Sequence, residues 1–148
     1  MTPSLPAPRR QRVTGSVPVS CNLIDGGPDP GCTPGALDSA VNQQNIGQTI
    51  CVPGYTGRVR PTSAAISRIR GPLVAAYHES MADFYGPFGE IDHRIPLELG
   101  GSSAIANLWP EPGRRPNAKD EIEDRLKADV CAGRITLAEG IRRVLAWP

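Results

Sequence analysis

The chain has 148 residues, a net charge of +1 and only two histidines. This length predicts one domain with a modest core, and the small net charge excludes strong electrostatic steering of the whole protein toward nucleic acid. No stretch approaches the roughly 20 apolar residues of a membrane-spanning helix, so no membrane partner is expected.

The charges are unevenly distributed between the two halves of the chain. Residues 1–72 carry seven arginines against three aspartates, which gives +4, whereas residues 73–148 carry nine basic and twelve acidic residues, which gives −3. The basic half could hold a phosphate backbone beside a site in the acidic half. Ordinary solvated surface charge explains the same pattern equally well.

Sixteen prolines and sixteen glycines predict long irregular connections. Residues 1–30 are expected to form an irregular segment that precedes one domain over residues 31–148, and the first 18 residues are predicted to be a tail. Arg9, Arg10 and Arg12 are not followed by the apolar run of a secretory signal. The cytoplasm is therefore the favoured location.

The four cysteines leave the export of the chain open. They lack the paired C-x-x-C spacing of a structural zinc site, but their even number permits two disulfides in an exported protein, with free thiols as the alternative. Cys32 and Cys51 flank a predicted short helix. If the chain is exported, we expect at least one disulfide, between these two residues.

The first elements are predicted in the middle of the N-terminal half. A short helix is expected within residues 38–50, where apolar residues recur among asparagine and glutamine, and a short extended piece over residues 56–60. A longer helix should start at Pro61-Thr62-Ser63. Gly71-Pro72 should kink that helix or divide it in two, because proline removes a backbone donor.

The acidic half predicts a β-hairpin. After a loop at residues 80–89, residues 90–97 are predicted to be a strand that ends before Gly100-Gly101. Residues 107–109 should return as a second strand, and residues 110–116 should be irregular because of their prolines.

Two helices are predicted to follow. The first should begin at Asn117, a good N-cap residue, and stop at Gly133. The last should begin at the capping-box sequence Thr136-Leu137-Ala138-Glu139. The overall expectation is an α+β domain, mainly helical, in which helices from residues 36–80 and 137–146 brace a small two-stranded unit.

The chemistry is concentrated in the dipeptide Asp92-His93. Imidazole titrates near neutral pH, so His93 is a candidate general base, and Asp92 can hold a hard cation through oxygen. Neighbours in an extended strand point to opposite faces. The cation and the base could therefore lie on either side of the backbone, or a local twist could bring both to one phosphate.

Other polar residues nearby complete a candidate site for phosphodiester hydrolysis. Asn107 could orient the imidazole, and Asn117 could give a second metal ligand, although each is equally well explained as a turn or cap residue. Three arginines are candidate phosphate contacts: Arg94, Arg114 and Arg115. His78 has the pattern of a helix-surface residue and is given no role.

Taken together, these motifs resemble the HNH nucleases of the ββα-metal class. The order is Asp92-His93, Gly100-Gly101, Asn107-Leu108 and then Asn117 at a helix start. The strings DHRIPLELGG and NLWPEP are most similar to a small actinobacterial and phage group of HNH-like proteins. The similarity covers roughly residues 31–140.

The resemblance implies a ββα-metal motif over about residues 90–131 and a metal-dependent endonuclease acting on DNA, or less probably RNA. It implies that His93 activates water with Asn107 as its orienting partner. One Mg²⁺ or Mn²⁺ ion, or alternatively Zn²⁺, would be held by Asp92 and Asn117.

The sequence departs from the family pattern at the third HNH position, which is not a histidine. The register also allows Lys119 or Asp120 there, and Glu90 and Glu98 are further candidates for the site. The alternative function is a non-catalytic nucleic-acid-binding module, or a disulfide-stabilised structural module, that keeps the HNH scaffold.

Overall fold

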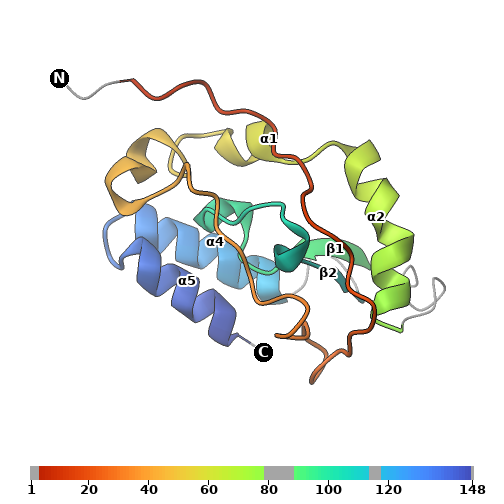
Figure 1. Ribbon diagram of the computed structural model, residues 1–148. Coiled ribbons are helices and arrows are strands. Elements are labelled where there is room, and N and C mark those ends of the chain that lie inside the picture. Colours follow the sequence, from red (N-terminus) through yellow and green to blue (C-terminus); the bar gives the residue numbers. More distant parts are fainter. Residues whose placement is uncertain (1–3, 79–88, 114–117, 148) are drawn as a thin grey trace.

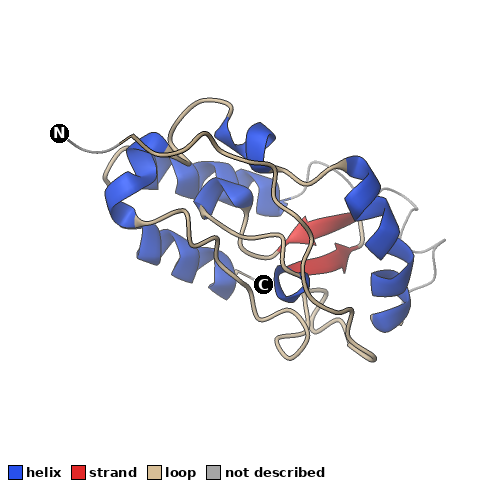
Figure 2. Ribbon diagram, turned by 45° about the horizontal axis from the view of Figure 1, so that its top comes forward, coloured by secondary structure: helices blue, strands red, loops and turns tan. Residues whose placement is uncertain are grey.

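The computed structural model describes residues 4–78, 89–113 and 118–147. It shows the predicted α+β domain, in which a two-stranded antiparallel hairpin packs against helices (Figure 1). Helix α2 contacts one side of the hairpin, and helices α4 and α5 lie against each other on the other side (Figure 2). The described elements are, in chain order, η1 (Gln43–Gln48), α1 (Tyr55–Val59), α2 (Ser63–Ala76), β1 (Glu90–His93), η2 (Leu97–Leu99), η3 (Ile105–Asn107), β2 (Leu108–Glu111), α4 (Ala118–Cys131) and α5 (Leu137–Ala146).

The hairpin pairs β1 with β2 in a register that places Glu90 opposite Glu111 and His93 opposite Leu108. The predicted first strand was too long, because Pro96 turns the chain into the 3₁₀ turn η2. The second strand continues through Pro110 and Glu111, which were predicted to be irregular. Proline is tolerated here because this two-stranded sheet consists only of edge strands.

Two N-terminal predictions were wrong in detail. Residues 56–59 are not extended, since they belong to helix α1, which starts after Gly54 at φ +84° and has Arg60 as its C-cap. Tyr55 and Val59, four residues apart, both bury their side chains on one face of this turn. The short helix predicted within residues 38–50 is a 3₁₀ helix over Gln43–Gln48, capped by the side chain of Asn42.

The longer helices begin and end near the predicted residues. Thr62 caps α2, which continues through Pro72 as one helix. The chain leaves α4 through Gly133 at φ +77°, and the Thr136 hydroxyl caps α5 by accepting from the backbone N–H of Glu139. The N-terminus predicted for α4 at Asn117 and the loop predicted at residues 80–89, apart from Gly89, lie outside the described residues.

The N-terminal segment, predicted to be irregular over residues 1–30, contains no helix over residues 4–42, but it is not a tail. The backbone N–H of Gln11 donates to the carbonyl of Val59, and Thr14 forms a parallel bridge with Ala104. The segment therefore crosses the domain as an extended strap over α1 and the loop before β2 (Figure 1). These contacts could not be predicted from the sequence, because they are made by backbone groups, which every residue type has.

The core has two parts, one on each side of the hairpin. The larger is formed by η2, α4, α5 and the residues around α1, with Leu99 and Val130 at its centre. The smaller contains Ala76, Tyr77 and Trp109, together with Cys21. No described helix is long and apolar enough to cross a membrane.

Both parts of the core carry a disulfide, and the predicted Cys32–Cys51 bond is wrong. Cys32 pairs with Cys21 in the smaller part, and Cys51 pairs with Cys131 at the end of α4. Cys32 and Cys51 pack against different parts of the core, which keeps them apart. Although the 3₁₀ helix η1 between these two cysteines is short, it does not bring Cys32 and Cys51 close together.

The two disulfides should differ in their contribution to stability. Cys51–Cys131 joins residues 80 positions apart, and Cys21–Cys32 joins residues 11 apart. The loop-entropy relation then predicts a loss of about 4–5 kcal/mol for the C51A/C131A variant and about 3 kcal/mol for C21A/C32A. Urea unfolding of the wild type and both variants measures these losses in the free energy of unfolding. A larger loss in C21A/C32A than in C51A/C131A would contradict the prediction.

Candidate metal and catalytic site

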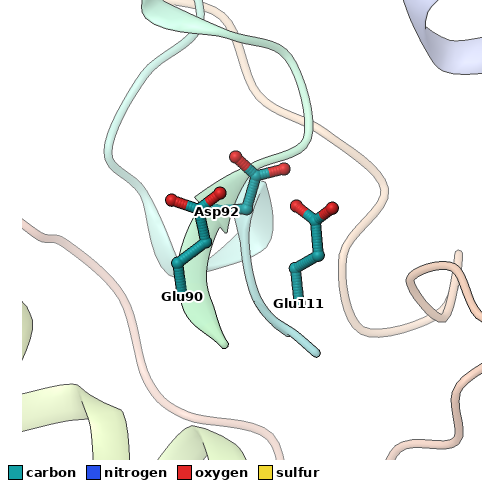
Figure 3. Close-up of side chains that lie close together, drawn as sticks. All are labelled: Glu90, Asp92 and Glu111. Carbon is teal, nitrogen blue, oxygen red and sulfur yellow. The ribbon is translucent and has the colours of Figure 1, made fainter. Parts of the chain in front are cut away.

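Three carboxylates converge on one face of the hairpin. Glu90 and Asp92 lie two residues apart on β1 and so point to the same side, and Glu111 lies across the hairpin from Glu90. One oxygen from each lies within 4.8 Å of the other two (Figure 3). Such a set of hard oxygen atoms matches the preferences of Mg²⁺ and Mn²⁺.

The closeness of these carboxylates has an electrostatic consequence at Glu111. Burial and the neighbouring Asp92 raise the pKa of Glu111 to about 9, and the two side chains share a hydrogen bond. Glu111 therefore carries a proton at neutral pH, since two carboxylates this close cannot both ionise easily. A cation between them would relieve this repulsion, so the residues present fit a divalent ion.

Lys119, from the first turn of α4, lies on the helix side of Asp92. Its Nζ donates to Asp92 Oδ2 at 2.5 Å, to Glu123 Oε1 at 2.6 Å and to the carbonyl of His93 at 3.0 Å. The lysine is 4% exposed, and the adjacent carboxylates hold the pKa of its ammonium above the usual value despite burial. This ion-pair cluster fastens α4 to the hairpin.

His93 points away from the carboxylates and is held by a hydrogen-bond relay. Its Nε2 lies 3.0 Å from the Ser103 hydroxyl, which itself donates to Gln11 Oε1 at 2.5 Å. Gln11 has a fixed orientation because its Nε2 donates to Asp38 and to the carbonyl of Gly101. Ser103 therefore accepts from His93, so the imidazole carries its proton on Nε2 and offers the lone pair of Nδ1.

The imidazole is buried and neutral. Burial, with the nearby charges of Arg60 and Lys119, lowers the pKa of His93 to about 4, against the opposing effect of Asp92. A neutral ring with one free nitrogen can accept a proton from water. Among the described residues, Nδ1 has no hydrogen-bond partner.

Asn107 has a different partner from the predicted one. Its amide does not touch the His93 ring, because its four hydrogen bonds go to backbone groups of Ile95, Ser102 and Ala36. It is fully buried. Asn107 therefore positions the loop that follows His93, and Ser103 takes the place of the orienting residue.

A cavity of about 410 Å³ opens beside these groups. Asp92 and His93 both line it, although neighbouring residues of a strand point to opposite faces. Pro96 and Leu97, at the start of η2, line it too. Arg60 lines it as well, 3.8 Å from Glu98. The cavity is lined by Arg60, Glu90, Asp92, His93, Pro96, Leu97, Glu98, Asp120 and Glu123.

The other predicted site residues are divided between the cavity and the interior. Glu90, Glu98 and Asp120 line the cavity, whereas Arg94 is half-buried and its guanidinium donates to the carbonyl of Thr33 at 2.6 Å. The predicted metal ligand Asn117 and the predicted phosphate contacts Arg114 and Arg115 lie outside the described residues.

Four residues of the site were missed by the sequence analysis: Gln11, Ser103, Glu111 and Glu123. The register of the hairpin could have identified Glu111, since it faces Glu90. Helical spacing could have identified Glu123, four residues after Lys119. Gln11 lies 82 positions before His93 in the chain, and no local pattern connects the two.

The chain is matched by no protein-family model, no curated protein and no solved structure. Its functional reading therefore depends on the geometry of this site.

The buried imidazole should make stability depend on pH. The pKa of His93 falls from 6.5 to about 4 on folding, so the unfolded chain binds more protons between these values. Stability should therefore fall as the pH drops from about 6.5 to about 4, by on the order of 3 kcal/mol from this group. The contribution of His93 to this slope should be absent in His93→Gln, whose amide can still reach Ser103.

Other buried carboxyls also titrate, so the measurement is the difference between wild type and variant. Urea unfolding of both proteins at half-unit steps from pH 4 to 7.5 gives that difference. A constant gap across the range would show that His93 is not buried in its neutral form.

Proposed function

We propose that this protein is a metal-dependent phosphodiesterase that cleaves DNA in the manner of an HNH-like nuclease. The observation that carries the proposal is the convergence of Glu90, Asp92 and Glu111. Two of these carboxylates, Glu90 and Asp92, line one cavity together with the buried neutral His93. The hairpin and α4 would form the ββα-metal unit. The Asp-His, Gly-Gly and Asn-Leu motifs support the same reading.

In this proposal the chain's own residues divide the work. Glu90, Asp92 and Glu111 would hold one Mg²⁺ or Mn²⁺ ion, which supplies charge neutralisation at the phosphate when bound. His93 takes a proton from water through Nδ1, and Ser103 with Gln11 keeps the other nitrogen protonated. Asn107 holds the loop that follows His93 in place through its hydrogen bonds to Ile95 and Ser102.

The substrate path is supported by the arginines around the strap. Arg10 Nη1 donates to the carbonyl of Arg60, so the strap and the end of α1 lie side by side, and Arg60 reaches the cavity. Arg9, Arg10, Arg12, Arg58 and Arg60 are all exposed. A phosphate backbone could follow these side chains into the cavity.

A second candidate function, a non-catalytic nucleic-acid-binding module, is favoured by Lys119. Its ammonium already donates to Asp92 and Glu123, so these two carboxyl groups have a partner without a divalent ion. This module would use the same arginines to bind DNA but would not hydrolyse it.

A plasmid-nicking assay separates the two functions. The wild type should nick supercoiled DNA with Mg²⁺ or Mn²⁺ and lose this activity with chelator. Asp92→Ala should abolish metal-stimulated nicking. His93→Ala should reduce it by roughly 10²–10⁴-fold, the usual contribution of a positioned general base, while metal affinity stays nearly unchanged.

The matched control for His93 is the only other histidine, His78, which is exposed and bonds to Ser20 away from the cavity. His78→Ala should nick at the wild-type rate. Nicking by His93→Ala at that rate would refute the mechanism. A wild type that binds DNA but never nicks it with either ion would establish the binding module instead.

The arginine path predicts the salt dependence of DNA binding. Removing two phosphate contacts in the R58S/R60S variant should lower the slope of log K against log salt by about 2. The slope is measured by fluorescence-polarisation titrations of a labelled duplex at salt concentrations from about 50 to about 200 mM. R134S/R142S removes the same charge and should keep the wild-type slope. Equal slopes for both variants would place the DNA elsewhere.

A further inference from the structure

The Lys119 ammonium has the surroundings of a bound cation. All three of its N–H groups point at oxygen atoms of the protein, two on carboxylates and one on the backbone. The three contacts span 2.5 to 3.0 Å. With a side chain that is only 5% exposed, water has almost no share in its coordination.

The choice of lysine at this position is informative. The chain has fourteen arginines and only two lysines, Lys119 and Lys127. An ammonium is compact, and its three N–H donors are arranged around one nitrogen atom. The donors of a guanidinium lie in one plane and are spread over three nitrogen atoms, so they match three oxygens around one point less well. Lysine at position 119 therefore places a compact cation between these three oxygens.

Asp92 belongs to both charged groups. Its Oδ2 accepts from Lys119, and it is also one of the three carboxylates that converge on the hairpin face. A divalent ion held there would have to share this carboxylate with the ammonium. The ammonium both occupies one oxygen and repels a second cation nearby.

We propose that Lys119 is the resident cation of this site and that it competes with divalent metal for Asp92. The inference rests on the metal site of the proposed function. The competition lowers the affinity for a divalent ion and confines the ion to Glu90, Glu111 and the remaining oxygen of Asp92. Lys119 thus sets how much metal the protein needs.

Lys119→Met tests the competition, because methionine is also unbranched, is only one atom shorter than lysine and carries no charge. Calorimetric titration with MgCl₂ and MnCl₂, in the absence of DNA, measures affinity without reference to cleavage. The expected result is at least tenfold tighter binding of both ions than in the wild type. Equal or weaker binding by the variant would overturn the proposal.

Lys127→Met is the matched control. Lys127 lies on the same helix, eight residues further along or about 12 Å along the axis, and its substitution changes the net charge of the protein by the same amount. Its affinity should equal that of the wild type. If Lys127→Met tightened binding as much as Lys119→Met, the effect would be one of net charge and the proposal would fail.

Lys119→Met leaves Asp92 and Glu123 without their cation, and it could fail to fold. The K119M/E123M variant removes the whole ion pair on α4, a change that is often neutral for stability when apolar side chains of similar size fill the space. Circular dichroism identifies the folded variants. The same tenfold gain is expected of the double variant, and its absence there also overturns the proposal.

Failure of this inference and failure of the proposed function are distinguishable. If the wild type and the variants bind metal equally well and all nick DNA, the proposed role of Lys119 is wrong and the proposed function stands. Metal binding that appears only when Lys119 is replaced would support that role and show that the natural chain does not depend on metal. Metal binding by none of the proteins would overturn both.

Discussion

The buried amide of Asn107 is the interaction on which the site's geometry depends. It accepts from the backbone N–H groups of Ile95 and Ala36 and donates to the carbonyls of Ile95 and Ser102. These bonds tie the residues after β1, the turn before β2 and the N-terminal half to one point. The two bonds to Ile95 are buried and those to Ala36 and Ser102 are partly buried. Loss of the amide would therefore leave the backbone groups of Ile95 unsatisfied.

The Gly-Gly motif is explained by the same constraint. Gly100 has φ +83°, which favours glycine, and a Cβ on Gly101 would overlap the carbonyl oxygen of Ile95. The loop thus closes tightly enough for Asn107 to reach both of its sides. In this chain the Gly-Gly motif is therefore a structural requirement for closing the loop around Asn107.

How much could be predicted from the sequence follows from the range of each interaction. The caps at Thr62 and Thr136 and the spacing of Glu90 and Asp92 on β1 depend on neighbours within a few residues, and the local pattern was sufficient for them. Local patterns also predicted the two strands of the hairpin, but not where each strand ends. The strap contact of Gln11 with Ser103 and the pairing of Cys51 with Cys131 join distant segments. No local pattern specifies such pairs, because they are decided by how the layers pack.

The electrostatics of the centre argue for a binding function rather than a purely structural one. Asp92, Glu111 and Glu123 are placed around a single ammonium, and burial raises the pKa of Glu111 to about 9 and that of Glu123 to about 8. Apolar side chains in these places would stabilise a scaffold at least as well, since buried ion pairs rarely repay their desolvation. The chain instead maintains an excess of carboxyl groups beside a cavity that reaches solvent. Under the proposed function, this arrangement would favour cation binding at some cost in stability, because phosphodiester hydrolysis requires a cation at the phosphate.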